Sequence, residues 1–552
     1  MWFTLLHTPL QDALVAIIGS GLATYFVYKR WEPESTTLAV FLLGGVPAVL
    51  SMLLVSHYGA ILAAPAAFTI YYATILIVMV LYRLSPIHPL ARYPGPVSCK
   101  ISILWPLRLA LKGKRHLWIQ ALHQRYGDAV RIGPNELSIQ DASAIAPLMG
   151  TTGLPKGPNL LGRMMSPSIP PLIALRDPAQ HADRRKGWNR AFTPAAIREY
   201  EVPLIKRVKQ LTDLLLSHRG EAFDLCEAIN YFTYDFMGEM VFGGFTDMLL
   251  EGDKHGLWAM IEKGLPVATV FEHIPWITPH LRKLPAVQNA AQRIRAFGVG
   301  KASERHKRGS QKKDLFFYLN RDHESDVEPH PQVITEGNLA IIAGSDTTSS
   351  VLCNIFYLLL SHSDVLEKLQ NEIDHYYPPQ TDSLDSTHYS QMLYLEAVIN
   401  EALRLYPAVL SGSQRAPIPG SGGKLVGQYY IPEGTNVRIH FYSVHRDPRN
   451  FYPYPESFWP ERWLIAAGHL PTPDDFVHNT AAFIPFSFGP YNCAGKHMAM
   501  AEMRMVVCHL IHELQFRFAD GCDPSVWEKQ LEDMFVVKKG RLPVVVMPRV
   551  QC

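Results

Sequence analysis

The sequence predicts a mainly α-helical fold with a smaller β region, preceded by a multi-span transmembrane anchor. Nearly uncharged apolar runs fill most of residues 1–84. Amphipathic helical patterns dominate residues 198–300, and a long, largely apolar helix is predicted over 332–361. Two β-hairpins are predicted, at 129–139 and 428–437, because turn-forming residues interrupt strand-like sequence there.

The composition excludes several classes of protein. The chain has 552 residues, of which 48% are hydrophobic, and a net charge of +2, so it can bury a large core but does not have the charge of a nucleic-acid binder. The seven cysteines are scattered and form no C-x-x-C pair, which argues against a disulfide framework or zinc site and favours a reducing compartment. Because no dinucleotide-binding motif occurs, electrons for a redox reaction would come from a partner.

Three apolar runs, at 13–28, 37–56 and 60–82, predict the membrane anchor and its contact with lipid. Each is about long enough to cross a hydrocarbon core of ~30 Å. Pro47 and Pro65 fall inside the second and third runs, and membrane helices tolerate proline better than soluble helices do. The alternative, that one or two runs are buried core helices, stays open, above all for the second run.

The distribution of basic residues predicts the orientation of the anchor. Lys29 and Arg30 close the first run and Arg83 closes the third, whereas the loop at 56–59 carries no lysine or arginine. The positive-inside rule then places the N-terminus in the lumen of the endoplasmic reticulum and everything after Arg83 in the cytosol. A proline-rich hinge at 85–97 would hold the following domain at a set angle to the membrane.

A cysteine near the C-terminus lies in a glycine-flanked, aromatic loop at 486–495. Gly489 and Gly495 permit turns and close approach that a side chain would block. Backbone N–H groups of the loop and of the helix predicted at 496–503 can stabilise negative charge on the sulfur of Cys493. A thiolate held in this way suits haem iron, although a buried structural cysteine is the plainer alternative.

The pattern F-x-x-G-x-x-x-C-x-G, formed by Phe486, Gly489, Cys493 and Gly495, resembles the haem-ligand signature of the cytochrome P-450 monooxygenases. The resemblance implies thiolate-ligated haem b as cofactor, with Cys493 as the axial ligand of the iron. It also implies a cytochrome P-450 fold over 98–552, after the anchor (1–84) and the hinge (85–97). The family usually has arginine or histidine where this chain has Tyr491, so a haem propionate would lack one cationic partner.

A basic helix is predicted at 181–192, with His181 and Arg185 four residues apart on one face. By the resemblance, these two residues fall where the family places donors to the haem propionates, and Arg415 is the expected second propionate cation. The remaining basic residues could dock an acidic electron-transfer partner or form a solvated face: Arg184, Lys186 and Arg190.

The long helix predicted at 332–361 contains an unusual centre, Ala-Gly-Ser-Asp-Thr-Thr at 343–348. These are mostly poor helix formers, and Gly344 alone costs ~1 kcal/mol relative to alanine. We therefore expect a local opening of the helical hydrogen-bond ladder, as is common at functional sites. The alternative is a Ser/Thr-rich kink with hydroxyl groups bonded back to the helix.

This segment resembles the oxygen-activation helix of the same family. The match implies that Thr347 carries a proton-relay hydroxyl and that Asp346 supplies protons. It further implies that Ala343 and Gly344 form the groove that makes room for dioxygen.

Two further motifs predict a structural ion network. Glu401 and Arg404 form an E-x-x-R pair on a predicted helix, and Arg462 lies in a P-E-R-W element about sixty residues later. In the family these three residues would form a buried network that locks the core facing the haem. The segment at 157–173 is rich in Met, Pro and Gly without a clear period, which predicts a flexible lid. The resemblance implies that this lid covers the substrate pocket and that a hairpin turn near Met534 and Phe535 enters the substrate site.

The resemblance implies a haem-thiolate monooxygenase, and the apolar runs and basic residues predict a multi-pass anchor of the endoplasmic reticulum with the catalytic domain in the cytosol. The enzyme would use dioxygen and electrons from NADPH, delivered by NADPH-cytochrome P-450 reductase with cytochrome b5 as a second candidate donor, to oxidise a small apolar substrate. The similarity to fungal members suggests secondary metabolism, including terpenoids. Two alternatives remain: a haem-thiolate isomerase or dehydratase, and a non-catalytic membrane haem-binding protein, which Tyr491 alone supports.

Overall fold

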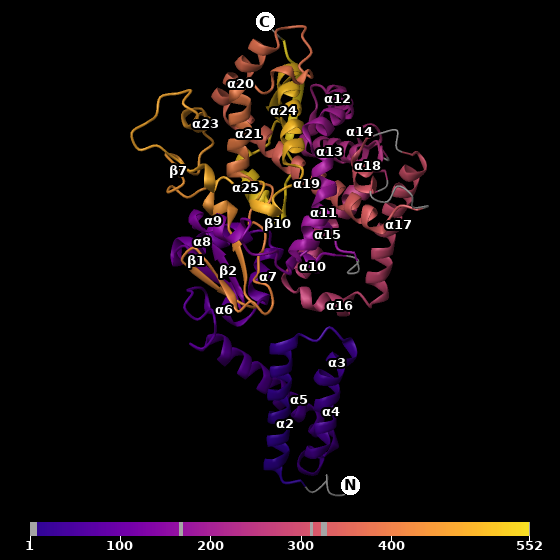
Figure 1. Cartoon of the computed structure of the whole chain (residues 1–552), viewed down its shortest axis with the longest axis vertical. Coiled ribbons are helices and arrows are strands. Elements are labelled where there is room, and N and C mark those ends of the chain that lie inside the picture. The colour runs from indigo at the N-terminus through magenta and orange to yellow at the C-terminus, as the bar shows by residue number, and fades with distance from the viewer. Residues whose placement is uncertain are drawn as a thin grey trace.

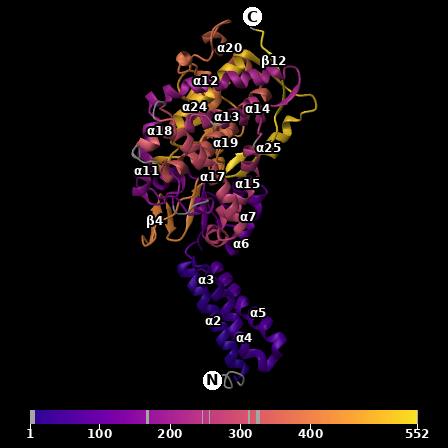
Figure 2. The same ribbon diagram turned by 90° about the vertical axis from the view of Figure 1, so that its right-hand side faces the viewer.

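A computed structural model describes residues 8–164, 169–244, 246–254, 256–309, 313–321 and 328–550. Figure 1 shows a narrow helical bundle at the N-terminal end and a much larger domain above it. The view in Figure 2, turned by 90°, shows the same bundle projecting from one end of the larger domain.

Three consecutive helical segments form the N-terminal bundle, and the second runs antiparallel to the first and the third (Figure 1). The third begins at Gly59, where the φ of 73° breaks the helix in the left-handed region, which favours glycine. The predicted runs coincide with these segments. Their elements are α2 (Leu10–Trp31), α3 (Thr36–Val40), the π-helical η1 (Phe41–Gly45), α4 (Val46–Ser51), η2 (Met52–Leu54) and α5 (Val55–Leu84).

Pro47 explains the π-helical turn in the second segment. Proline has no backbone N–H, so one carbonyl of the preceding turn, that of Leu42 or of Leu43, loses its helical donor. The hydroxyl groups of Tyr71 and Tyr72 on α5 donate hydrogen bonds to these carbonyls at 2.8 and 2.5 Å. A membrane interior requires that backbone polar groups be paired, and the two tyrosine hydroxyls meet this requirement where Pro47 interrupts the helical hydrogen bonds.

The helices at Leu10–Trp31 and Thr36–Leu84 are long and apolar enough to cross a membrane. α19 (Pro331–Ser361) meets the same criterion, but 72% of its apolar window is buried within the protein. The corresponding windows of the N-terminal helices are only 28% and 11% buried. Their uncovered apolar side chains suit contact with lipid, whereas α19 is a core helix.

The anchor and the larger domain touch at α16 (Thr278–Leu281). The hydroxyl of Thr36, at the start of the second segment, lies 3.0 Å from Nδ1 of His280, and Lys283 donates to the same hydroxyl at 2.7 Å. On the hinge side, buried Arg131 donates to the carbonyl of Arg83 at 3.1 Å. The loop after the first segment and the end of the third therefore both face the larger domain.

The larger domain is organised around α19, and α13 (Leu225–Phe242) runs along it through the middle of the domain (Figure 1). Both helices are largely buried, because apolar residues occur on most of their faces. The other long helices are α8 (Arg115–Tyr126), α11 (Pro178–Ala191), α12 (Pro194–Ser217), α15 (Leu257–His273), α17 (Pro285–Lys307), α20 (Ser363–Tyr376), α21 (Leu393–Leu405) and α24 (Lys496–Glu513). Shorter helices are α6 (Val97–Ile101), α7 (Leu104–Leu111), α9 (Ile145–Met149), α10 (Asn159–Gly162), α14 (Met248–Glu251), α18 (Leu315–Asn320), α22 (Phe441–Val444), α23 (Glu461–Ala466) and α25 (Trp527–Gln530).

The β region is small and lies at the periphery. The predicted hairpin at 129–139 is present as β1 (Ala129–Gly133) and β2 (Glu136–Ile139), which pair antiparallel. β6 (Asn436–Ile439) adds to β2 in parallel, with Glu136 opposite Asn436. The remaining sheets contain β3 (Ala222–Asp224), β12 (Pro543–Pro548) and β9 (Leu514–Phe518); β10 (Glu532–Met534) and β11 (Val536–Lys538); β4 (Gly423–Val426) and β5 (Tyr429–Pro432); and β7 (Phe451–Tyr452) and β8 (Val477–His478).

The hairpin predicted at 428–437 is wrong in its register. β5 pairs with β4, which precedes it, and the turn between them lies at Gly427 and Gln428. β6 pairs with β2, from a distant part of the chain. The predicted lid at 157–173 contains α10, and its residues 165–168 lie outside the described residues.

Candidate functional site

The cysteine loop is a tight turn between the short 3-10 turn η8 (Thr480–Ala482) and α24. The short 3-10 turn η9 (Gly489–Tyr491) precedes the cysteine, and the N–H of Cys493 donates to the carbonyl of Phe486 at 2.9 Å. Gly489 has a φ of 71°, and a Cβ atom there would lie 2.1 Å from the carbonyl oxygen of Met149. Only glycine fits this position. Gly495 has an ordinary φ of −88°. A Cβ atom there would lie 3.7 Å from the ring of Phe192, its nearest neighbour among the described residues, so a side chain would fit.

The charge environment of Cys493 is mixed. By surface area the residue is exposed, but protein atoms crowd its sulfur, and this burial raises the pKa of the thiol. The Gly495 N–H, Arg185 and Lys496 act in the opposite direction and favour the thiolate. Coordination to a metal ion deprotonates such a thiol outright, so the loop is suited to a metal-bound thiolate rather than to a free one.

Arg185 holds the cysteine loop directly. Its Nη1 donates to the carbonyl of Asn492 at 2.8 Å and its Nη2 donates to the side-chain oxygen of the same residue at 2.9 Å. Its Nε bonds Asn189, one turn along α11, at 2.9 Å. Arg185 thus lies beside the loop, and its guanidinium already donates hydrogen bonds to the chain.

Four basic or aromatic side chains gather next to the loop. The ring of Tyr491 lies 4.4 Å from that of His181, 4.6 Å from the guanidinium of Arg415 and 5.3 Å from the ammonium of Lys156. Burial, together with the nearby positive charges of Lys156, Arg185 and Arg415, lowers the pKa of His181 to about 3. His181 is therefore a neutral hydrogen-bonding group at physiological pH, and the positive charge of the cluster comes from the other residues.

This cluster fits an anionic group. Arg415 is 1% exposed, and its Nε and Nη1 have no hydrogen-bond partner within the described residues. Burial lowers the pKa of Arg415 to about 10, which still leaves it charged at neutral pH. A buried, unpaired guanidinium is costly unless a ligand carboxylate or phosphate completes it. The two carboxylates of haem are groups of this kind. Cys493 lies in the adjacent loop, and its thiolate is a known ligand of haem iron.

The centre of α19 differs from the expectation. The helix is continuous through residues 343–348, without the expected opening. The hydroxyl of Thr347 donates to the carbonyl of Ala343 at 2.6 Å, and that of Ser345 donates to Ile341 at 2.7 Å. Back-bonded hydroxyls of this kind satisfy themselves within an intact helix, which is why the weak helix formers do not open the ladder.

Two neighbours qualify the expected roles on α19. A Cβ atom on Gly344 would lie 2.4 Å from the sulfur of Met237 on α13, so the missing side chain of Gly344 allows close packing of the two helices. Asp346 is 6% exposed, and burial raises the pKa of its carboxyl while Lys539 acts to lower it. Lys539 reaches α19 from the segment after β11 and donates to the hydroxyl of Ser349 at 2.8 Å. Sequence reasoning missed Lys539 because it belongs to no motif and lies far along the chain.

Glu401, Arg404 and Arg462 lie together with no exposed side-chain surface. Glu401 accepts hydrogen bonds from Arg404 at 2.8 and 2.9 Å and from Arg462 at 3.0 Å. The N–H of Trp459 and the indole N–H of Trp463 also donate to it, at 3.1 and 3.0 Å. The carboxylate of Glu401 therefore links α21 to α23 and to the segment before it.

Comparison with known proteins decides the family. The family model described as "Cytochrome P450" matches residues 93–545. The chain belongs to the cytochrome P450 family. The match covers the hinge end, the basic helix α11, α19 and the cysteine loop, and it confirms both the predicted fold class and the predicted enzyme class, a cytochrome P450 monooxygenase with haem as cofactor.

Several fungal cytochromes P450 are similar to this one over most of their length. "Cytochrome P450 monooxygenase nodW" of Hypoxylon pulicicidum is 34% identical over 516 residues, 92% of each chain. "Cytochrome P450 67" of Uromyces fabae is 31% identical and covers 94% of this chain and 96% of its own. "Averantin hydroxylase" of Dothistroma septosporum is 31% identical and covers 85% of this chain and 89% of its own.

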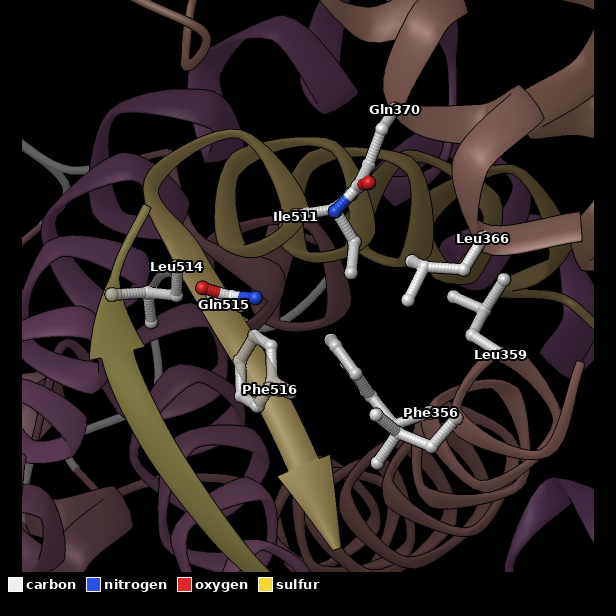
Figure 3. A pocket seen from close by; sticks show the side chains of 9 residues that line it. Phe356, Leu359, Leu366, Gln370, Ile511, Leu514, Gln515 and Phe516 are labelled. Carbon is white, nitrogen blue, oxygen red and sulfur yellow. The ribbon is translucent and has the colours of Figure 1, made fainter. Parts of the chain in front are cut away.

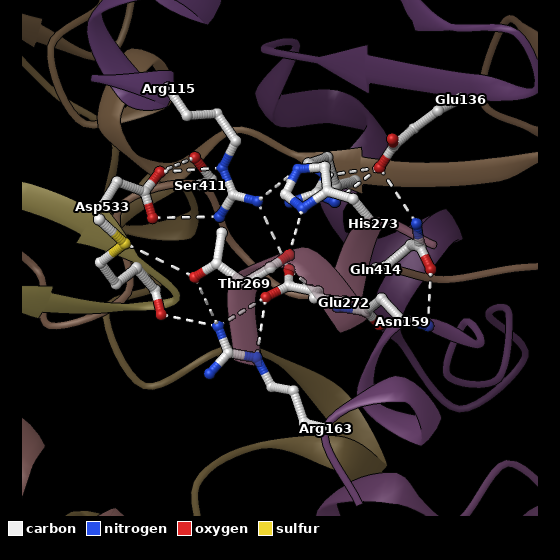
Figure 4. Close-up of polar contacts among 12 residues, drawn as sticks. Arg115, Glu136, Asn159, Arg163, Thr269, Glu272, His273, Ser411, Gln414 and Asp533 are labelled. Atoms are coloured by element: carbon white, nitrogen blue, oxygen red, sulfur yellow. Dashed lines mark hydrogen bonds and ion pairs between the residues drawn. The ribbon is translucent and has the colours of Figure 1, made fainter. Parts of the chain in front are cut away.

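A second group of buried charges in this cytochrome P450, none of which belongs to the cysteine loop, joins four segments of the chain (Figure 4). Arg115 on α8 donates to Asp533 on β10 at 3.1 Å and lies 3.4 Å from Glu272 at the end of α15. Arg163, just after α10, pairs with Glu272 at 2.8 Å and donates to the carbonyl of Met534 at 2.7 Å. Burial alone would raise the pKa of Glu272, but Arg163 and Arg115 outweigh it and hold that pKa well below its usual range. The sequence gives no signal for this network, since each member is a single charge in a separate segment.

A cavity of about 120 Å³ lies between α19, α20, the end of α24 and β9 (Figure 3). Its walls include Phe356, Leu366 and Phe516, and the amide of Gln370 points into it. None of its lining residues belongs to the cysteine loop or to the centre of α19. In this cytochrome P450 the cavity is therefore separate from the candidate site.

Proposed function

We propose that the protein is a membrane-anchored haem-thiolate monooxygenase that oxidises a small apolar substrate with dioxygen and NADPH-derived electrons. The observation that carries the proposal is the cysteine loop. The backbone of Cys493 and the bonds from Arg185 to Asn492 hold this loop next to the buried guanidinium of Arg415, two nitrogens of which have no hydrogen-bond partner in the described part of the chain. Haem bound there would supply dioxygen activation. The protein must hold the thiolate, bind the carboxylates, exclude water and deliver protons.

The residues have distinct proposed roles. Cys493 is the axial ligand of the haem iron, and Phe486 with Gly489 and Gly495 shapes the loop around it. Arg415 and His181 bind haem carboxylates, and Arg185 completes that set while fixing Asn492. Glu401, Arg404 and Arg462 stabilise the core behind the loop and take no part in the chemistry.

Proton delivery is assigned to α19. The hydroxyl of Thr347 is held at the carbonyl of Ala343 and can pass a proton from its Oγ1 to a reacting oxygen. Asp346 would resupply the proton, because burial favours the protonated form of its carboxyl. The dioxygen groove is proposed at Ala343, on the same face as Thr347, and along the backbone of Gly344.

The electron donor and substrate are proposed from two kinds of support. The chain has no dinucleotide-binding motif of its own, so we propose NADPH-cytochrome P450 reductase as partner, with cytochrome b5 as an additional donor. The names of relatives support a fungal secondary metabolite as substrate, since one of them is an averantin hydroxylase. Terpenoids are a first class to test and rest on analogy alone.

We propose a multi-pass anchor in the endoplasmic reticulum membrane with the catalytic domain in the cytosol. The loop after the first segment and the end of the third both face the catalytic domain, as the basic residues Lys29, Arg30 and Arg83 require. A glycosylation acceptor fused to the N-terminus should be modified in microsomes, and the same acceptor inserted between residues 33 and 34 should not. The reverse pattern would contradict the proposed topology.

The deciding experiment is the absorption spectrum of the reduced protein under carbon monoxide. The wild type should show the strongly red-shifted Soret band of a thiolate ligand, and Cys493→Ala should lose it. Cys522→Ala, which removes another free cysteine, is the matched control and should keep the band. A band that survives Cys493→Ala would overturn the assignment of the ligand.

Consumption of NADPH and dioxygen with purified reductase separates the monooxygenase from its alternatives. A haem-thiolate isomerase or dehydratase would convert its substrate without consuming either. A non-catalytic haem-binding protein would show the red-shifted band without turnover. Substrate-dependent consumption of both is the result expected here.

A further inference from the structure

Lys156 is a residue without a role in the motifs of this chain, and the fold places it against Arg415. The two residues face each other across an isolated antiparallel β-bridge, which is reinforced by backbone hydrogen bonds from Gly157 to Gln414 (2.9 Å) and from Ala416 to Pro155 (3.1 Å). Directly opposite residues in an antiparallel pair put their side chains on the same face. Lys156 and Arg415 therefore approach the cysteine loop together.

Both side chains are buried basic groups. Burial and the nearby charges of Arg415 and Arg185 lower the pKa of Lys156 well below its usual value, so its charged form needs an anion beside it. Lys156 is 8% exposed and Arg415 is 1% exposed. Lys156 donates one hydrogen bond, to the carbonyl of Leu172 at 2.8 Å, and forms no ion pair among the described residues. The acid that influences it, Glu336, is already bonded to Arg184, Trp188 and a backbone N–H. Two buried basic groups side by side disfavour each other's charged form, so an anion is needed to hold both charges there.

Tyr491 lies between these charges. Its ring is 4.6 Å from the guanidinium of Arg415 and 5.3 Å from the ammonium of Lys156, within the range in which an aromatic face attracts a cation. An arginine at position 491 would instead place a third positive charge against the other two. The tyrosine and the lysine thus complement each other. Tyr491 leaves the cysteine loop without the usual cation, and Lys156, from the segment just before α10, supplies a basic group in its place.

We propose that Lys156 binds a haem carboxylate and supplies the positive charge that the family pattern places two residues before the cysteine, while Tyr491 positions Lys156 and Arg415. This inference rests on the proposed haem site. It also replaces the expectation that a haem propionate lacks a cation because of Tyr491: the cation is present but comes from another segment.

The test measures the rate of haem loss from the full-length, haem-loaded protein in detergent to an excess of apomyoglobin. Lys156→Met should lose haem about tenfold faster or more, as expected for removal of a charge-assisted hydrogen bond. Lys156→Arg should stay near the wild type. Lys206→Met, which removes an exposed lysine on α12, is the matched control and should not change the rate.

The charge exchange is tested by adding Tyr491→Arg. In the Lys156→Met background it should slow haem loss again, because the arginine restores the missing charge. In the wild-type background it should not slow haem loss, because Lys156 already occupies the site. Slower loss in the wild-type background, or no rescue in the double variant, would overturn the inference.

A purely structural role for Lys156 is separated by haem dimethyl ester, in which both carboxylates are blocked. Lys156→Met should accelerate loss of haem but not of the ester, whereas a damaged fold would release both faster. Equal acceleration of both would overturn the inference, and so would an unchanged rate for haem. If Lys156→Met does not fold, Lys156→Gln, which keeps a donor for the Leu172 carbonyl, is tested in the same way.

The failure of this inference differs from that of the proposed function. The red-shifted band of the wild type under carbon monoxide is recorded first. If the band is missing or does not depend on Cys493, both the haem-thiolate function and the role of Lys156 are wrong. If the band is normal and Lys156→Met behaves like Lys206→Met, only the role of Lys156 is wrong.

Discussion

The backbone N–H of Ile484 donates a hydrogen bond to Nε2 of His445 at 3.0 Å. The other ring nitrogen, Nδ1, lies 3.2 Å from the carbonyl of Arg404, so it must carry the proton and donate. Burial and the nearby positive charges of Arg404 and Arg446 lower the pKa of His445 to about 3. A neutral histidine thus links the end of α21 to the segment that leads into the cysteine loop.

His445→Ala should therefore destabilise the cysteine loop through the segment that precedes it. The change leaves the Ile484 N–H and the Arg404 carbonyl unpaired in the core, which should lower the free energy of unfolding by about 2–5 kcal/mol. Haem content after purification should fall with it. Thermal unfolding and the haem-to-protein ratio measure both effects, and His469→Ala, at an exposed position, is the control. A wild-type haem content in His445→Ala would contradict this link.

Glu401→Gln should be the most destabilising of the conservative substitutions proposed here. It leaves the buried guanidinium groups of Arg404 and Arg462 without their shared counter-charge, at a cost of about 3–5 kcal/mol. Chemical denaturation of the detergent-solubilised chain gives the free energy of unfolding. Asp520→Asn breaks a surface ion pair in which the aspartate is 94% exposed and should cost less than about 1 kcal/mol. Similar losses for the two variants would reject a stabilising network.

Thr347→Ala should uncouple electron use from product formation. Without the hydroxyl at this position, protons reach the reacting oxygen less efficiently, so NADPH consumption continues while hydrogen peroxide is released in place of product. The measurement is peroxide and product formed per NADPH, with the red-shifted band under carbon monoxide confirming bound haem. Thr335→Ala removes a hydroxyl that is back-bonded in the same way on the same helix, at 2.9 Å, and should stay coupled. An unchanged product yield in Thr347→Ala would reject the proton-relay role.

The stability of the domain should fall as the pH drops below about 6.5, before the ordinary carboxylates titrate. Burial lowers the pKa of His116, His123 and His509 to about 4 and that of His445 to about 3. Above the unfolded pKa of about 6.5 these groups are neutral in both states, and stability is complete. Between about pH 6.5 and 4 the unfolded chain binds protons that the folded chain does not, so unfolding becomes easier.

Melting temperatures of the full chain at pH 8, 7, 6 and 5 test this dependence. His509→Gln should flatten the slope between pH 7 and 5, because one of the contributing groups is gone while a side-chain amide can still bond Ser383. A melting temperature that stays constant from pH 8 to 5 would show that these histidines are protonated without penalty. A carboxylate with a lowered pKa also loses its contribution as the pH falls, but only below about pH 5, so the pH window separates the two kinds of group.

Features encoded by neighbouring residues could be predicted from the sequence. The three anchor segments, α19 and the hairpin at 129–139 follow from apolar runs, periodicity and turn residues, which act over a few positions. The need for glycine at position 489 was also visible, because the cysteine loop is a local motif. The hairpin at 428–437 was not, since β6 pairs with β2 and a distant partner overrode the local pattern.

The residues that surround the cysteine loop and α19 were harder to predict than the motifs themselves. Lys156 meets Arg415 through a β-bridge between two segments with no local signal of pairing, and Lys539 reaches α19 from the C-terminal segment. The expected opening of α19 failed for a different reason. Helix propensities predict that these residues weaken the helix, but the propensities do not take hydroxyl groups into account that bond back to the carbonyls of the preceding turn. Thr347 and Ser345 form such bonds.

The carboxylate of Glu272 has a mechanical consequence. Asn159, Arg163 and Arg115 all contact it, from α10, from the residue after α10 and from α8. None of these elements can part from the end of α15 without leaving a buried charge short of a partner, which costs several kcal/mol. Separation of the elements from α15 is therefore cooperative, because they share a single carboxylate. If the entry of a ligand required these elements to separate, it would depend on brief, all-or-none openings, and their frequency would limit the rate of entry.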